Sequence, residues 1–410
     1  MPYDRLRLPR GGRPARTGGE GVTGGRAFWP LLAVHAILVQ AVSYGLRPSL
    51  SYAVLDLGYG PAWVAVVAAM FAVPPLVLAV MTGRLVDRLG ERPGLVIGGV
   101  ALTASAVVAS LGSRSLAMLV IATALLGVGI VFSMVGEQSA VAGRARPGGL
   151  DAAFGGYTFI TSLGQGVGPL LLLVPPAPGS QAPPLVPIAA VCGAASVVIL
   201  AVSFGFGSRH RASQAPDARH RWPARRLLAI PGMYRAMLVG ALILASIDVT
   251  LAYLPVLAHE RGIAPGWVTA MLAARAAAQM LSRVNLAGLV RLLGRRRLTV
   301  AACGVSGLAL LGLTPPFPAA VLIVLTSVYG FAAGVCQPIT MGWVAALAPP
   351  GTRGTVLSLR IAGNRLGQSL IPVLSGAAAT VGGASGVLAL TGATLGIAAW
   401  SATAIADNKD

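Results

Sequence analysis

Charged side chains are scarce in this chain of 410 residues. Asp, Glu, Lys and Arg together make up 10% of it and apolar residues 55%, whereas soluble globular domains carry about 25% charged residues. Acidic residues are the rarest charged group, since 12 of them stand against 31 basic ones. This composition argues against an ordinary soluble domain and indicates long segments that lie in a membrane.

The sequence also lacks the patterns of several function classes. Its arginines form short clusters between apolar segments rather than one continuous face, which argues against a nucleic-acid binder. We find no nucleophile–base pair, metal-ligand spacing or phosphate loop, so we expect no enzyme activity, no metal site and no cofactor. The three cysteines lie within apolar segments, and we interpret them as packing residues: Cys192, Cys303 and Cys336.

Two stretches contain no charged residue. They cover 152–208 and 298–352, and each can hold two helices of roughly 20 residues, the length that crosses a bilayer. Proline clusters near the middle of both stretches supply the turns. Because backbone polar groups find no water in hydrocarbon, we predict an all-α membrane protein of twelve transmembrane helices, at 28–47, 62–83, 94–113, 115–137, 153–173, 185–207, 234–257, 266–286, 298–314, 319–347, 355–379 and 383–406.

Arginines divide the connections into two sets. The segment before the first helix, the second-to-third link, the central loop and the eighth-to-ninth link contain nearly all of them, while the alternate side receives only Arg47, Arg114 and Arg261. By the positive-inside rule we expect a multi-pass protein of the inner (plasma) membrane with both termini in the cytoplasm. We take Arg47 and Pro48 as the outer end of the first helix.

The chain contains an internal repeat with an offset of 203–204 residues. Gly-Pro-Ala-Trp-Val at 60–64 returns as Ala-Pro-Gly-Trp-Val at 264–268, and Leu-Gly-Gln at 163–165 returns at 366–368. We therefore predict two parallel six-helix halves, 28–207 and 234–406, joined by a basic cytoplasmic linker at 208–233. The flanks, 1–27 and 407–410, are expected to be tails, the first of them disordered.

Residues 83–92, Gly-Arg-Leu-Val-Asp-Arg-Leu-Gly-Glu-Arg, resemble the signature loop between the second and third helices of the major facilitator superfamily. Glu91 stands where that loop usually has a basic residue. The resemblance implies the major facilitator fold and a cytoplasmic gate made by Gly83, Asp87, Arg88 and Gly90.

A second motif resembles the helix-five glycine motif of efflux antiporters in that superfamily. Gly155, Gly164, Gly168 and Pro169 match it, whereas Leu172 and Leu173 replace its last two glycines. The superfamily's helix-four Arg is also missing, because Thr123 occupies its place. The resemblance implies proton-coupled export, although the missing Arg moves any proton coupling to other residues.

Charged and polar residues at bilayer depth are the candidate functional residues, because a charge there is costly unless it faces a cavity or a partner. We predict Asp248 and Glu137 as candidates for proton coupling. Asp248 alternatively forms a structural ion pair with Arg275 or Arg365. The candidates for the substrate cavity are His35, Gln40, Tyr44, Arg275, Asn364 and Arg365.

The leading functional hypothesis is a secondary transporter that exports a small hydrophobic or amphipathic compound against proton entry, by alternating access. An importer or facilitator of a small polar metabolite is the first alternative. A non-transporting membrane sensor or scaffold is the second. The expected partners are a small-molecule substrate, protons and the lipid bilayer, with no nucleic acid, and we expect a monomer.

Overall fold

The computed structural model describes residues 23–144, 150–175, 182–207, 223–349 and 353–405. These residues are almost entirely helical. The α-helices are α1 (Thr23–Asp56), α2 (Pro61–Leu89), α3 (Glu91–Leu111), α4 (Leu116–Arg144), α5 (Leu150–Val167), α6 (Leu185–Ser203), α7 (Ala224–Leu228), α8 (Met233–Glu260), α9 (Pro265–Val284), α10 (Leu286–Leu293), α11 (Arg295–Gly312), α12 (Ala319–Leu347) and α13 (Arg353–Thr403), and a 3₁₀ helix, η1 (Gly168–Leu173), continues α5.

These elements form twelve spans in the bundle. Within the part of the chain that the structure describes, eight helices are by themselves long and apolar enough to cross a membrane. The helices α5 with η1, α9 and α11 are shorter or carry arginines, and they complete the bundle. The long α13 contains two spans, because the chain turns at Gly383, whose φ of 57° lies in the left-handed region that glycine tolerates.

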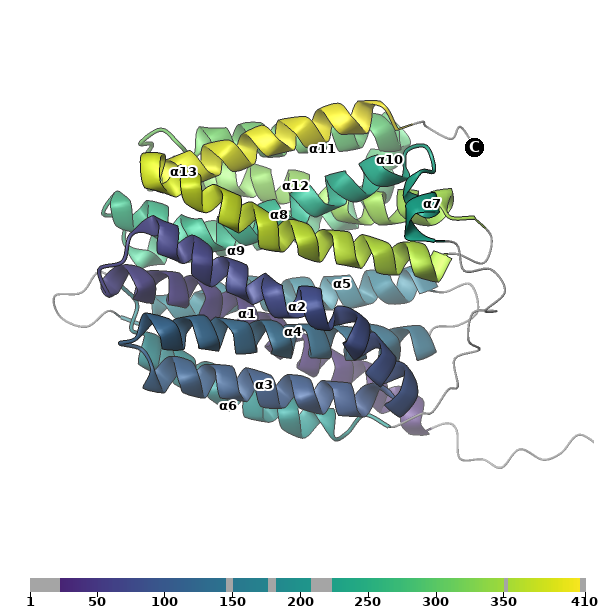
Figure 1. Cartoon of the computed structure of the whole chain (residues 1–410), viewed down its shortest axis with the longest axis horizontal. Helices are drawn as coiled ribbons and strands as arrows, with labels where there is room; N and C mark the ends of the chain where they lie inside the picture. The colour runs from purple at the N-terminus through teal and green to yellow at the C-terminus, as the bar shows by residue number, and fades with distance from the viewer. Residues whose placement is uncertain (1–22, 145–149, 176–181, 208–222, 350–352, 406–410) are drawn as a thin grey trace, which may run out of the picture.

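The spans separate into two halves of six (Figure 1). The purple-to-teal helices α1–α6 occupy the lower part of the view, and α8–α13 occupy the upper part. The first half meets the second through α1, α2 and α5, which pack against α8, α13 and α9. We call the end where α1 begins and α13 ends, on the right of Figure 1, the terminal end. The opposite end is the far end.

Matching glycine turns confirm the internal repeat. Gly90, between α2 and α3, has φ 84° and ψ 177°, and Gly294, between α10 and α11, has φ 75° and ψ 157°. Gly58 and Gly262, which follow α1 and α8, both have positive φ, at 82° and 65°. Each pair is separated by the 204 residues seen in the sequence repeat.

Glycines also let helices approach closely at equivalent places in the two halves. A Cβ on Gly127 of α4 would clash with the carbonyl oxygen of Phe71 on α2. In the second half, a Cβ on Gly330 of α12 would clash with the carbonyl oxygen of Arg275 on α9. Small residues of this kind are a usual means of packing helices in membranes, where lipid supplies no hydrophobic driving force between them.

Several predicted boundaries differ from the structure. The first helix does not end at Arg47 and Pro48 but continues to Asp56 with Pro48 inside it. Neighbouring helices can satisfy the backbone groups that a proline frees in a membrane helix. Helix α1 also begins at Thr23, inside the predicted tail, and the predicted linker includes the short helix α7. Residues 1–22, 208–222 and 406–410 of the predicted tails and linker lie outside the described residues.

Candidate functional site

A salt bridge joins the two halves near the middle of the bundle. Arg47 of α1 donates from Nη1 to Oδ1 of Asp248 on α8 at 2.7 Å, with side-chain exposures of 6% and 9%. Gln368 of α13 donates from Nε2 to the other carboxylate oxygen of Asp248. Among the described residues there are three salt bridges, and only this one connects the halves.

The partner of Asp248 differs from both predicted partners. Arg365 reaches it only through Gln368, because Arg365 donates from Nη1 to Oε1 of that glutamine at 3.0 Å. Arg275 contacts other residues. The expectation that Arg47 lies at the outer membrane surface is therefore wrong, since its guanidinium is buried between the halves.

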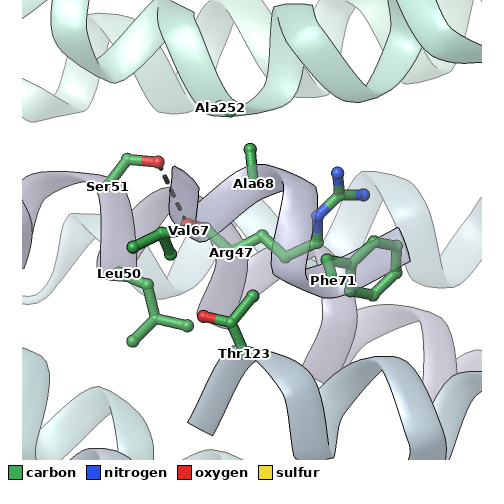
Figure 2. A pocket seen from close by; sticks show the side chains of 8 residues that line it. All are labelled: Arg47, Leu50, Ser51, Val67, Ala68, Phe71, Thr123 and Ala252. Carbon is green, nitrogen blue, oxygen red and sulfur yellow. Dashed lines mark hydrogen bonds between the residues drawn. The ribbon is translucent and has the colours of Figure 1, made fainter. Parts of the chain in front are cut away.

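Besides Asp248, Arg47 contacts an aromatic ring and lines a small cavity, as Figure 2 shows. Its guanidinium lies 4.0 Å from the ring centroid of Phe71, close enough for a cation–π interaction. A cavity beside it has a volume of about 10 Å³ and is lined by Arg47, Leu50, Ser51, Val67, Ala68, Phe71, Thr123 and Ala252. That volume is close to the room one water molecule needs, so a transported solute does not fit here.

A second polar cluster lies wholly within the first half. His35 of α1 is 2.7 Å from Glu137 of α4 through Nδ1 and 3.1 Å from Ser203 of α6 through Nε2. Tyr157 of α5 donates its hydroxyl to the second carboxylate oxygen of Glu137 at 2.8 Å. Both Glu137 and His35 are completely buried. The structure thus places Glu137 inside the bundle, where partners on α1 and α5 bond both of its carboxylate oxygens.

The remaining predicted cavity residues are also buried. Arg275 is fully buried, and its guanidinium lies 5.7 Å from the ring centroid of Tyr44 on α1. Asn364 is buried, and its Oδ1 has no hydrogen-bond partner. Gln40 is buried where α1 meets α5, because a Cβ on Gly164 would lie 2.7 Å from the Cβ of Gln40.

A third polar cluster, which was not predicted from the sequence, is centred on Arg283 of α9. Its Nη1 donates to the hydroxyl of Ser162 and, at 3.2 Å, to the carbonyl of Thr158, both on α5 of the other half. Its Nη2 donates to Oε1 of Gln337 on α12 at 3.1 Å. Arg283 follows Arg275 by eight residues, so the helical period alone could have placed both on one face.

The halves also contact each other at the far end. Tyr253 of α8 donates its hydroxyl to the carbonyl of Pro61 at 3.0 Å, and Thr269 of α9 donates to the carbonyl of Pro169 at 3.2 Å. A Cβ on Gly376 of α13 would lie 3.1 Å from the Cβ of Ala65 on α2. The described hydrogen bonds between the halves thus extend from the far end to the Arg283 cluster.

Comparison with protein families identifies this arrangement. The model described as Major Facilitator Superfamily matches residues 32–319 and 236–408. The chain belongs to the major facilitator superfamily. It is therefore a multi-pass membrane transporter of small molecules, with the family's twelve-helix fold.

Solved structures agree on the fold. A crystal structure of the D-xylose-proton symporter has a TM-score of 0.74 at 15% identity and covers 94% of this chain and 99% of that one. The inward open conformation of the xylose transporter XylE from E. coli scores 0.72 at 14%, covering 94% and 97%. The nucleoside transporter NupG scores 0.72 at 12%, covering 92% and 98%. Among curated proteins, no match was found.

The signature loop of the superfamily contains a salt bridge. Glu91, which departs from the usual pattern, is buried and accepts a hydrogen bond from Nη1 of Arg144 at 2.9 Å. Arg144 also lies 4.0 Å from the ring of Phe28. The acid therefore ties the start of α3 to the end of α4. Of the predicted gate residues, Gly90 forms the turn, Arg88 is exposed and a Cβ on Gly83 would meet open space, while the Asp87 side chain lies outside the described atoms.

The helix-five glycines pack α5 onto α1. A Cβ on Gly164 would clash with the carbonyl oxygen of Ile37, and one on Gly168 would lie 2.6 Å from that of Ala41. At Pro169 the helix changes to the 3₁₀ helix η1. Gly155 faces open space. Half of the motif therefore has a clear packing role in this transporter.

Two of the cysteines interpreted as isolated packing residues lie together. The Sγ atoms of Cys303 on α11 and Cys336 on α12 are 3.8 Å apart, and both thiols are free. Cys192 is buried elsewhere, on α6. Within the described residues, no group of three or more His, Cys, Asp or Glu side chains could hold a metal ion.

Proposed function

We propose that the protein is a proton-coupled secondary transporter of the plasma membrane, which moves a small polar solute by alternating access. The observation that carries the proposal is the Arg47–Asp248 salt bridge, because it joins the two halves that must separate when access changes. Protonation of Asp248 removes its charge and with it the ion pair. Proton binding and the separation of the halves are then linked through one carboxylate.

The contacts between the halves support a closed far end. With the terminal end in the cytoplasm, as the arginine distribution predicts, the closed far end is the extracellular side. Solute would then enter or leave the region of the Arg283 cluster from the cytoplasm. Both termini lie on the cytoplasmic side in this orientation.

Export of an amphipathic compound is the second candidate. The observation in its favour is the close packing of Gly164 and Gly168 on α1, since these are the matching positions of the efflux motif. The glycines act through helix packing and contact no solute, so they specify neither the direction nor the cargo. The polar character of the contact between the halves favours a polar solute.

Flux in reconstituted proteoliposomes tests the proposal. Uptake of labelled sugars, nucleosides, organic acids and amphipathic dyes would be measured with a pH gradient of either sign and with an uncoupler. Gradient-driven uptake of at least one compound, abolished in Asp248→Asn and retained in Arg114→Gln, is the expected result. Flux that does not depend on the pH gradient, or gradient-driven flux that is unchanged in Asp248→Asn, would reject proton coupling at this site.

A further inference from the structure

Positive charge greatly exceeds negative charge in the interior of the second half. From residue 223 to 405 the only acidic residues are Asp248 and Glu260. Glu260 lies at the far end, where its carboxylate accepts hydrogen bonds from the backbone nitrogen of Ala384 at 3.0 and 3.1 Å. Asp248 is already paired with Arg47. No carboxylate within this half therefore remains to pair with its interior arginines, which are Arg275, Arg283, Arg360 and Arg365.

Arg275 has the poorest set of partners among them. It is completely buried, and Nη1 makes a single hydrogen bond, to Oε1 of Gln279 on the same helix at 3.3 Å. Its Nε and Nη2 have no partner. A buried guanidinium with two free nitrogens is costly in a membrane protein unless an anion completes it. The ring of Tyr44, at 5.7 Å, compensates only part of that cost.

Two further guanidiniums donate hydrogen bonds to different atoms of Gln337 on α12. Arg283 donates to its Oε1 at 3.1 Å, and Arg360 of α13 donates to its backbone carbonyl at 3.4 Å. The Nε of Arg360 has no partner. Arg283, Gln279 and Arg275 follow one another at intervals of four residues, so all three lie on one face of α9. That face packs against α12, since a Cβ on Gly334 would lie 3.0 Å from Gln279.

We propose that Arg275, Arg283 and Arg360 form an oxyanion-binding site, and that the transported solute is a small organic anion carrying a carboxylate or a phosphate group. Guanidinium groups donate in a planar fork that fits both oxyanions. Arg283 and Arg360 are partly exposed, whereas Arg275 lies deeper. In the proposed site the anion binds the first two, and the free nitrogens of the third complete its hydrogen bonds. The inference rests on the proposed transport function, but anion binding needs no proton gradient.

Equilibrium binding to the purified full chain in detergent tests the site. The probes are succinate and benzoate as carboxylates, glycerol 3-phosphate as a phosphate ester, and xylose and uridine as neutral compounds, all at constant ionic strength. Thermal stabilisation and calorimetric titration are the readouts. We expect at least one oxyanion to bind and both neutral compounds to fail. Preference between the carboxylates and the phosphate ester identifies the group that the site recognises.

Variants separate a specific site from general attraction to a basic protein. Arg283→Gln and Arg360→Gln should each weaken binding of the preferred anion by about tenfold to a hundredfold, since a charge-assisted hydrogen bond is lost. Arg114→Gln, an exposed arginine between α3 and α4, should bind as the wild type does. Arg275→Gln should also bind the anion more weakly. If this variant fails to fold, Arg283→Gln and Arg360→Gln still test the site.

Two results would overturn the site. One is equal behaviour of anions and neutral compounds, and the other is unchanged affinity in both Arg283→Gln and Arg360→Gln. Because binding is measured without a gradient, failure of proton coupling in the flux assay leaves this readout intact. Conversely, gradient-driven flux of a neutral solute without anion binding would support the proposed transport function and reject the oxyanion site.

Discussion

The salt bridge between the halves predicts strong energetic coupling between Arg47 and Asp248. Removing one member of a buried pair typically costs about 3–5 kcal/mol, whereas replacing both members can be nearly neutral. We therefore expect Arg47→Met and Asp248→Asn each to lower the free energy of unfolding. Asp248→Asn should cost less within this range, because Phe71 still contacts Arg47 and Gln368 can still bond the amide. The double variant should lose at least about 2 kcal/mol less than the sum of the two single losses.

Reversible unfolding in mixed detergent micelles, followed by circular dichroism, measures the four free energies. The Glu91–Arg144 pair is a control, because it is also an Arg–carboxylate pair, although Arg144 is only partly buried, and it lies within one half. Gradient-driven flux should fail in the Arg47–Asp248 double variant even though its stability recovers, while the control double variant should still transport. Additive losses at Arg47 and Asp248 would show that this bridge does not form in the protein and would refute the coupling argument.

Three further predictions concern packing and the other clusters. Gly164→Ala should destabilise the protein, because the added methyl group would clash with the backbone of Ile37. Gly155→Ala lies on the same helix but faces open space, so it should be neutral or stabilising by up to about 1 kcal/mol. Unfolding measurements on both variants test this difference. Glu137→Leu should lower the free energy of unfolding by at least about 2 kcal/mol, because His35 and Tyr157 each lose a buried hydrogen-bond acceptor. An unchanged free energy of unfolding would contradict these hydrogen bonds. Mild oxidation should join Cys303 to Cys336 but leave Cys192 free for alkylation, which peptide mass mapping would reveal.

Helix positions were predictable from the sequence because they depend on local properties. Uncharged length, proline clusters and turn glycines such as Gly90 and Gly294 fix where spans begin and end, whatever their neighbours. The exception at Pro48 is informative, since a proline ends a helix in water but is tolerated within a packed membrane bundle. The hairpin at Gly383 was placed correctly as a boundary, although its linking turn is much tighter than an ordinary loop.

The partners of the buried charges could not be predicted in the same way. Asp248, Arg275 and Arg365 were recognised as intramembrane charges, but which charges meet depends on the rotation and separation of the helices that carry them. Close approaches at glycines set these quantities, as at Gly330 against Arg275. Arg47 was assigned to a helix end, so its pairing with Asp248 was missed. Arg283 was overlooked although its spacing from Arg275 was visible in the sequence.

The two partners of Arg47 become available at very different times during synthesis. Asp248 follows Arg47 by 201 residues, which at roughly 5–20 residues per second is a delay of about 10–40 s. Throughout that interval a guanidinium must remain in the membrane without its carboxylate, a state that costs about 2.5–3.5 kcal/mol by insertion measurements. Phe71 belongs to the next helix and reaches the membrane long before α8. The ring of Phe71 can therefore contact Arg47 while the chain is only partly synthesised, and the salt bridge forms only after α8 has been inserted.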